Sequence, residues 1–207
     1  MNTADAVTMV GDRFGWSGQP VEVAAPHGTV WVFAELDEFE HDDRRDRDVG
    51  SVTDLAVLAA LTELPHQMPV PAASLAPHTR QVLDTAPPGI VRASDDGHVE
   101  RLVRRPVRVH GAVAAGRWST VNRHVGAFGT LAEVAVLTRQ RPRPAGGPTL
   151  QAAVWGQGLA FWAPDDTIEV VQHPEPSLRL PGAYQWWLTE IVYWAMTART
   201  VTASPTA

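Results

Sequence analysis

The fold of this chain is decided by the stretch Pro106-Val-Arg-Val-His-Gly-Ala-Val-Ala-Ala-Gly-Arg-Trp118. Its first nine residues alternate or run apolar over the length of one β-strand. The residues that follow the turn at 115–117 are amphipathic, with Trp118, Val121, Val125 and Phe128 at helical spacing. The stretch therefore predicts a strand that leads directly into a helix.

Three further segments repeat this alternation. Residues 131–137 predict a second strand, 150–155 a brief helix, and 159–162 with 168–171 two closing strands around the turn Asp165-Asp166. Strands that are joined through helices form crossover connections in a partly parallel sheet. The expected fold class is α/β (α+β), with a small mixed β-sheet core and crossover helices.

The N-terminal third has a weaker pattern. No element is predicted over residues 1–20. Residues 21–25 and 29–34 predict a β-hairpin because valine and aromatic residues favour strands, although 30–39 also fits a helical period. The acidic run 35–48 is interpreted as a solvated linker. A divalent cation bound by its carboxylates is the alternative.

Composition excludes several chemistries. The 207 residues contain no cysteine, and all 17 basic residues are arginine, so disulfides, thiolates and lysine Schiff bases are excluded. The eight histidines form no pair at positions i and i+4, and we expect neither a metal nor a cofactor. The chain shows no secretion signal and no apolar run long enough to span a membrane, so a cytoplasmic location is expected.

The net charge of −6 is unevenly distributed. Residues 31–54 hold nine acidic residues and three arginines, whereas residues 92–143 hold ten arginines and four acidic residues. A basic middle section in an acidic chain indicates a local anionic partner.

Residues 50–104 predict a separate unit. Ser51 is positioned to cap a helix that Pro65 stops, residues 69–75 allow only a short second helix, and Pro77 suits the start of a third. Residues 90–102 then predict a hairpin with Asp96-Gly97 as its turn.

Three helices followed by an arginine-bearing hairpin resemble a winged helix-turn-helix domain over residues 51–103. This resemblance implies that the third helix enters the DNA major groove and that the hairpin, or wing, contacts the backbone. The short, proline-flanked second helix departs from the family pattern. Alternatively, Arg80 pairs with Asp84 and the hairpin arginines form a solvated face. The residues implied in DNA contact are His78, Arg80, Gln81, Arg92, Arg101, Arg104 and Arg105.

Residues 105–174, together with the hairpin at 21–34, resemble the restriction-endonuclease-like fold. Active members carry Glu-x-Lys on a strand just before a helix, and in this chain Ala112 and Ala114 stand at those positions. Alanine neither binds a metal nor carries a proton. The resemblance therefore implies a degenerate relative that is not an enzyme.

A Trp-rich C-terminal helix is predicted over residues 183–196. Its expected buried stripe consists of Tyr184, Trp187, Leu188, Ile191 and Trp194. Trp186 and Tyr193 lie off this stripe and are the candidate residues for a protein interface or for self-association. Residues 200–207 are expected to form a loose tail.

The expected organisation is a hairpin and acidic linker at 1–49, a winged-helix-like unit at 50–104 and an α/β core with the C-terminal helix at 105–199. The leading functional hypothesis is non-catalytic binding of duplex DNA. A protein-interaction module that uses the C-terminal helix is the alternative, and a metal-dependent nuclease or phosphoesterase is a third possibility.

Overall fold

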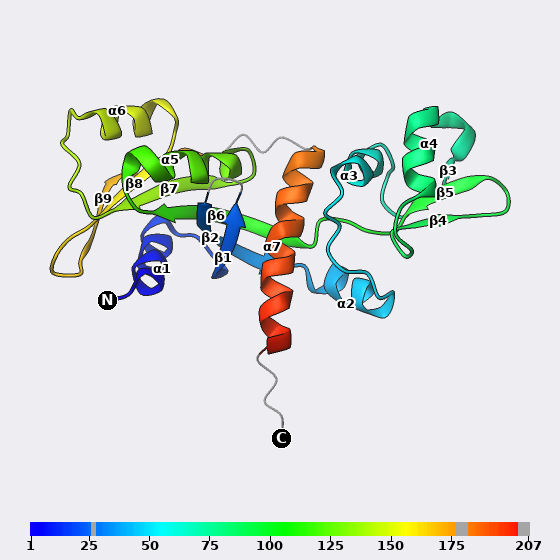
Figure 1. Ribbon diagram of the computed structural model, residues 1–207, viewed down its shortest axis with the longest axis horizontal. Coiled ribbons are helices and arrows are strands. Elements are labelled where there is room, and N and C mark those ends of the chain that lie inside the picture. The colour runs from blue at the N-terminus through cyan, green and yellow to red at the C-terminus, as the bar shows by residue number, and fades with distance from the viewer. Residues whose placement is uncertain (26–27, 177–181, 203–207) are drawn as a thin grey trace, which may run out of the picture. The chain divides into compact units, whose positions relative to one another are not determined.

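The computed structural model describes residues 1–25, 28–176 and 182–202 (Figure 1). The chain divides into two compact units, each built from two segments. Unit 1 comprises Met1–Glu35 and Val109–Leu180, and unit 2 comprises Leu36–Arg108 and Pro181–Ala207. The described residues mix helices and strands, which confirms the expected α/β class.

A six-stranded mixed sheet is the framework of unit 1, with strand order β1-β2-β6-β7-β8-β9. The hairpin β1–β2 is antiparallel, β6–β7 and β7–β8 are parallel, and β8–β9 is antiparallel. The predicted hairpin and the partly parallel sheet are therefore confirmed. The strands are β1 Gln19–Ala25, β2 Gly28–Leu36, β6 Val107–Ala115, β7 Glu133–Thr138, β8 Gly158–Trp162 and β9 Ile168–Gln172.

Helices cover both faces of this sheet. Residues Ala6, Val7 and Val10 of α1 pack on one face, against alternate residues of the strands such as Val113 and Leu137. In Figure 1, α5 and α6 lie on the opposite side of the sheet from α1. These elements are α1 Thr3–Phe14, α5 Trp118–Gly126 with the 3₁₀ turn η2 Ala127–Thr130, and α6 Gly147–Val154.

Helix α1 was not predicted, although its sequence carries end signals. The Asn2 side chain accepts a hydrogen bond from the backbone N–H of Asp5, and Gly15 ends the helix with φ of 73°. Gly111 on β6 is also fixed by packing near this helix. A Cβ atom there would lie 2.1 Å from the Trp16 ring, so only glycine lets that ring lie across the strand.

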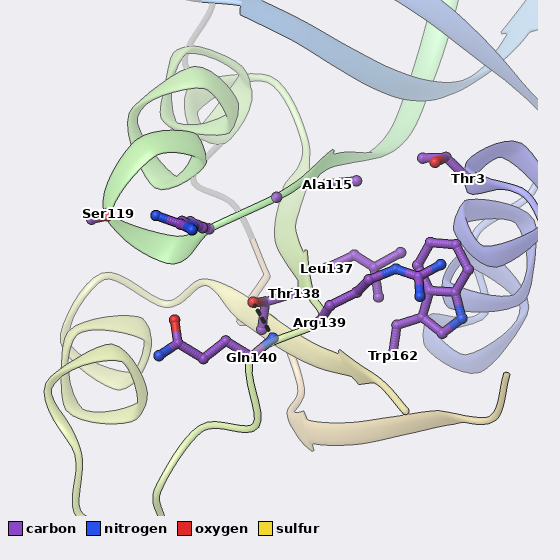
Figure 2. Close-up of a pocket in the computed structure, with 10 residues that line it drawn as sticks. Thr3, Ala115, Ser119, Leu137, Thr138, Arg139, Gln140 and Trp162 are labelled. Carbon is purple, nitrogen blue, oxygen red and sulfur yellow. Dashed lines mark hydrogen bonds between the residues drawn. The ribbon is translucent and has the colours of Figure 1, made fainter. Parts of the chain in front are cut away.

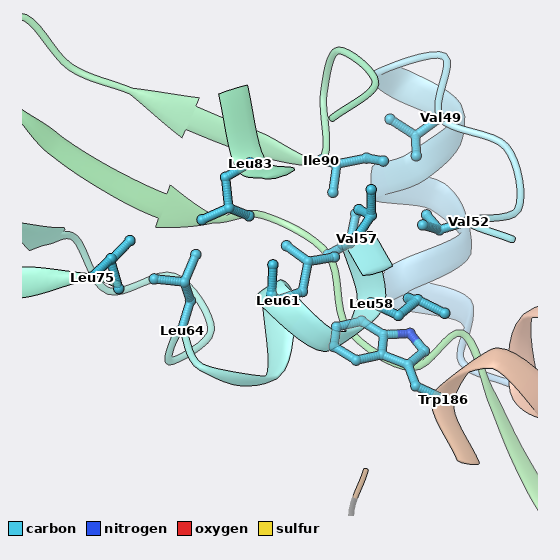
Figure 3. Close-up of a cluster of buried hydrophobic side chains, with 12 residues drawn as sticks. Val49, Val52, Val57, Leu58, Leu61, Leu64, Leu75, Leu83, Ile90 and Trp186 are labelled. Atoms are coloured by element: carbon cyan, nitrogen blue, oxygen red, sulfur yellow. The ribbon is translucent and has the colours of Figure 1, made fainter. Parts of the chain in front are cut away.

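Unit 2 has its own apolar core. Leu58 and Leu61 of α3, Leu83 of α4 and Trp186 of α7 gather in it with Ile90 (Figure 3). A three-stranded antiparallel sheet with the order β3-β5-β4 completes the unit. Its elements are α2 Glu38–Asp46, α3 Leu55–Thr62, β3 Val70–Pro71, the 3₁₀ turn η1 Ala72–Ser74, α4 Pro77–Asp84, β4 Val91–Ala93, β5 His98–Arg101 and α7 Ala183–Thr202.

The interpretation of the acidic run 35–48 as a linker is wrong. Residues 38–46 form helix α2, because Asp37 caps the helix start and Glu40 and Arg44 are buried on one side of it. Opposite charges in this run stand three or four residues apart, which is the spacing of neighbours on a helix. One such pair, Glu40 and Arg44, is buried inside the protein.

The expected buried face of the C-terminal helix is correct only in part: Leu188 is fully buried and Trp187 packs against the core, but the stripe is wrong at its ends. Trp186 and Tyr193 are buried, whereas Trp194 is 61% exposed and Tyr184 is 41% exposed. The helix is apolar on nearly every side, so periodicity did not define its buried face. Glu190 does define it, since this buried carboxylate pairs with Arg44.

The division of the chain differs from the expected one. Helix α7 and residues 36–49 belong to unit 2 with the 50–104 segment, not to the α/β core. The helix continues to Thr202, three residues into the expected tail, and residues 203–207 lie outside the described part. A membrane-spanning helix is not found among the described residues, since none is both long and apolar enough.

Candidate functional site

The outer face of α4 carries the first group of predicted site residues. Thr79 and Leu83 are buried, and the Thr79 hydroxyl donates to the Glu63 carboxylate at 3.0 Å, which fixes the rotation of the helix. His78, Arg80 and Gln81 are therefore exposed together. Within the described residues, none of these three side chains has a hydrogen bond or an ion pair. The alternative pairing of Arg80 with Asp84 is not formed.

The predicted hairpin is present beside α4. Strands β4 and β5 pair from Val91 with Arg101 to Ala93 with Val99, and Gly97 has φ of 79° in the predicted turn. Arg92 is exposed and forms an ion pair with Glu100 at 3.2 Å. The tip of the hairpin carries Asp95 and Asp96, so the charge of the hairpin as a whole is mixed rather than basic.

The remaining predicted arginines make contacts inside unit 2. Arg101 donates to the Leu61 carbonyl at 3.0 Å and lies over the Trp186 ring, 5.2 Å from its centroid. Arg104 pairs with Asp37 at 2.8 Å, and Arg105 donates to the Gly182 carbonyl at 3.4 Å. Burial lowers the pKa of both Arg101 and Arg105. These three residues brace the unit, and the exposed part of the predicted set is His78, Arg80, Gln81 and Arg92.

A buried ion network holds α2 and α7 together. Arg44 donates to Glu40 at 2.6 Å and to both carboxylate oxygens of Glu190 at 2.8 Å. Glu190 also accepts from the Val52 N–H and the Trp186 indole N–H, each at 2.9 Å. Burial acts to lower the pKa of Arg44, but the hydrogen bonds and charges of Glu190 and Glu40 outweigh it and raise that pKa. The arginine therefore stays charged.

The two predicted interface residues contribute to this interior. Trp186 is 3% exposed in the apolar core, and Tyr193 is 4% exposed. The Tyr193 hydroxyl lies 3.0 Å from Nδ1 of His41, and Arg44 lies over its ring at 5.2 Å. Neither residue is available to a partner in this fold. Binding of a protein by α7 remains a prediction, and the exposed aromatic residues Tyr184 and Trp194 would have to provide it.

The two positions at which active restriction-endonuclease-like proteins carry glutamate and lysine are also buried in this chain. Ala112 and Ala114 lie on the central strand β6 and are fully covered. In the described part of the chain, no three histidine, aspartate or glutamate side chains converge as metal ligands do. The absence of catalysis stays a prediction.

The sequence did not predict a pocket at the carboxyl ends of β6 and β7. Figure 2 shows Ser119 and Gln140 on one side of these strand ends and Arg139 with Trp162 on the other. The pocket has a volume of about 900 Å³. Its ten lining residues are Thr3, Ala115, Gly116, Arg117, Ser119, Leu137, Thr138, Arg139, Gln140 and Trp162.

Comparisons of this chain with protein-family models, curated proteins and solved structures find no match. Its functional residues are accordingly identified from its own geometry.

Proposed function

We propose that unit 2 binds duplex DNA without cleaving it, with α4 as the recognition helix and the β4–β5 hairpin as a wing. The order of elements supports this assignment: helix α3, short strand β3, one 3₁₀ turn, helix α4 and then a hairpin. Strand β3 pairs with β5 of the hairpin, so the helices and the hairpin form one compact body.

The observation that carries the proposal is the exposure of His78, Arg80 and Gln81 on one helix, with none of the three bonded within the described residues. Arginine and glutamine form bidentate hydrogen bonds with guanine and adenine edges in the major groove. Arginine also pairs with phosphates through two parallel hydrogen bonds. A helix that offers these groups side by side suits contact with both bases and backbone.

Arg92 is the hairpin residue that the proposal retains. Its guanidinium is exposed and pairs with Glu100 on the adjacent strand at 3.2 Å. Arg101, Arg104 and Arg105 are left out because their guanidinium groups already bond to Leu61, Asp37 and Gly182. The proposed interface thus contains two arginines, which implies modest affinity.

The experiment is fluorescence anisotropy of a labelled random duplex over a salt series. Arg80→Ala and Arg92→Ala are each expected to weaken binding and to reduce the slope of log K against log salt by about 0.9, the value for one phosphate contact. Arg45→Ala is the matched control, since this arginine is exposed on α2 of the same unit. Undetectable binding at low salt, or equal slopes in all three variants, would exclude this interface.

A further inference from the structure

We infer that unit 1 holds a separate binding site for the phosphate group of a small phosphorylated molecule, in the pocket at the carboxyl ends of β6 and β7. The inference does not depend on DNA binding, because no residue of the pocket belongs to unit 2.

The position and size of the pocket suit a small ligand. Strands β6, β7 and β8 are parallel, and Ala115, Leu137, Thr138 and Trp162 line the pocket from their carboxyl ends. Open α/β sheets bind ligands outside this edge. The volume of about 900 Å³ falls in the range of roughly 300–1,000 Å³ that small-molecule sites occupy.

All charged residues that line the pocket are positive. Two of its ten residues are arginines, Arg117 and Arg139, and none is acidic. In the part of the chain that the structure describes, neither arginine forms a hydrogen bond or an ion pair. Unit 1 thus offers two guanidinium groups with unused donors at this pocket, although the whole chain carries a net charge of −6. The Asp166 carboxylate interacts with the charge of Arg139 without bonding to it, and is itself paired with the N-terminus.

Arg139 is held in place without its donors being used. Its guanidinium lies over the ring of Trp162, 3.5 Å from the centroid. The ring is fixed in turn, since its indole N–H donates to Asp166 at 2.9 Å. Stacking on an aromatic face orients an arginine while its in-plane N–H groups remain able to donate. Such a group is preorganised for an oxyanion.

Arg117 approaches from the turn between β6 and α5. Gly116 has φ of 152°, and a Cβ atom there would lie 2.8 Å from the Val121 side chain, so the tight turn requires glycine. The Gly116 N–H donates to the Leu137 carbonyl at 2.8 Å, which ties the turn to β7. No side chain caps α5, so the N–H groups of Trp118 and Ser119 and the Ser119 hydroxyl add donors beside Arg117, whereas the Thr120 N–H already donates to the Arg117 carbonyl at 2.9 Å.

These donors favour a phosphate monoester over a carboxylate. A phosphate presents three terminal oxygens and close to two negative charges, so a guanidinium can bind it through two parallel hydrogen bonds while a further oxygen still accepts from another donor of the pocket. The apolar lining from Ala115, Leu137 and Trp162 leaves room for the organic part of the molecule.

The test is isothermal titration of the full chain with inorganic phosphate, adenosine monophosphate and adenosine at constant ionic strength. We expect saturable binding of both phosphate compounds, with a Kd of about 1 mM or tighter, and none of adenosine. Equal affinity for the two would identify a site for free phosphate, and tighter binding of the nucleotide would show that the organic part also contributes.

Arg117→Gln and Arg139→Gln are each expected to weaken phosphate binding by tenfold or more, which corresponds to about 1.4 kcal/mol. Arg123→Gln is the matched control, because this arginine is exposed on α5 but does not line the pocket. If loss of the Trp162 stack unfolds Arg139→Gln, the exposed Arg117 still decides the test. The inference fails if phosphate does not bind, if adenosine binds equally well, or if Arg117→Gln and Arg123→Gln behave alike.

Discussion

Replacing Arg44 by leucine tests the buried network of unit 2 directly. The arginine side chain is fully buried and neutralises two carboxylates, Glu40 and Glu190, which are also fully buried. It also donates to the Arg104 carbonyl at 2.9 Å. Leucine has a similar helix propensity, but it is smaller than arginine, so a cavity adds to the loss of the electrostatic interactions.

The expected loss in the free energy of unfolding follows from the contacts that the two carboxylates keep after Arg44 is replaced. Removing one partner of a buried ion pair costs about 3–5 kcal/mol, because the other charge is left without compensation. Here Glu190 loses its bidentate partner and keeps only neutral donors, the N–H groups of Val52 and Trp186. Glu40 keeps Arg104, whose backbone N–H donates to it at 3.1 Å and whose guanidinium lies 3.8 Å away. We therefore expect a cost of about 4 kcal/mol, within that range. This is a large share of a typical total of about 5–15 kcal/mol.

The assay is urea denaturation followed by circular dichroism at 222 nm. With a slope of about 2 kcal/mol per molar urea, a loss of 4 kcal/mol lowers the midpoint by about 2 M. Arg45→Leu is the matched control on the same helix, since its ion pair with Asp42 is exposed and is worth less than about 1 kcal/mol.

Arg44→Lys provides an intermediate variant, because lysine keeps the charge but not the two-pronged contact with Glu190. A folded Arg44→Leu protein with the same midpoint as Arg45→Leu would refute the reasoning.

The C-terminal helix gives two further predictions. Trp186→Ala should lower the free energy of unfolding by about 3–5 kcal/mol, because Trp186 is buried. Trp194→Ala should lower it little, because Trp194 is exposed. If urea denaturation showed the larger loss for Trp194→Ala, the assignment of the buried helix face would be wrong. Burial raises the pKa of Tyr193 above 10.0, so the folded protein holds a proton there that the unfolded chain releases. The resulting stability is complete below pH 10 and is lost as the pH rises toward the raised value. In a Tyr184→Phe protein, which leaves Tyr193 as the only tyrosine, absorbance at 295 nm should show ionisation above pH 10, and a midpoint at or below 10 would contradict this.

The sheet of unit 1 was largely predictable because its signals are local. The strands near 106–114, 131–137 and 159–162 are apolar runs bounded by glycine, proline or charged residues, and each occurs close to its predicted position. Helix α1 was missed because its apolar residues are mostly small and are interspersed with polar ones. Its signals were the Asn2 cap and the Gly15 stop.

The candidate sites depend on contacts that a single sequence does not display. Arg44 and Glu190 have the pattern of surface charges, and only their pairing shows that both are buried. The hairpin arginines also look alike in sequence, yet Arg92 is exposed and Arg101 bonds to a carbonyl inside the unit. The pocket at the carboxyl ends of β6 and β7 brings residues near 117 together with residues near 139. These residues line one pocket only because β6 and β7 are parallel.

The path of the chain through the two units has a kinetic consequence. Arg44 and its bidentate partner Glu190 are 146 residues apart, which at about 5–20 residues per second means roughly 7–30 s of synthesis on the ribosome. Strands β6, β7, β8 and β9 of unit 1 emerge within that interval, after β1 and β2 and before α7. Until then unit 2 has Arg44 paired with Glu40 but not with Glu190, and its core lacks Trp186. The unit that starts to emerge at Leu36 is therefore the last to be completed, and until α7 is made its apolar core stays open to solvent.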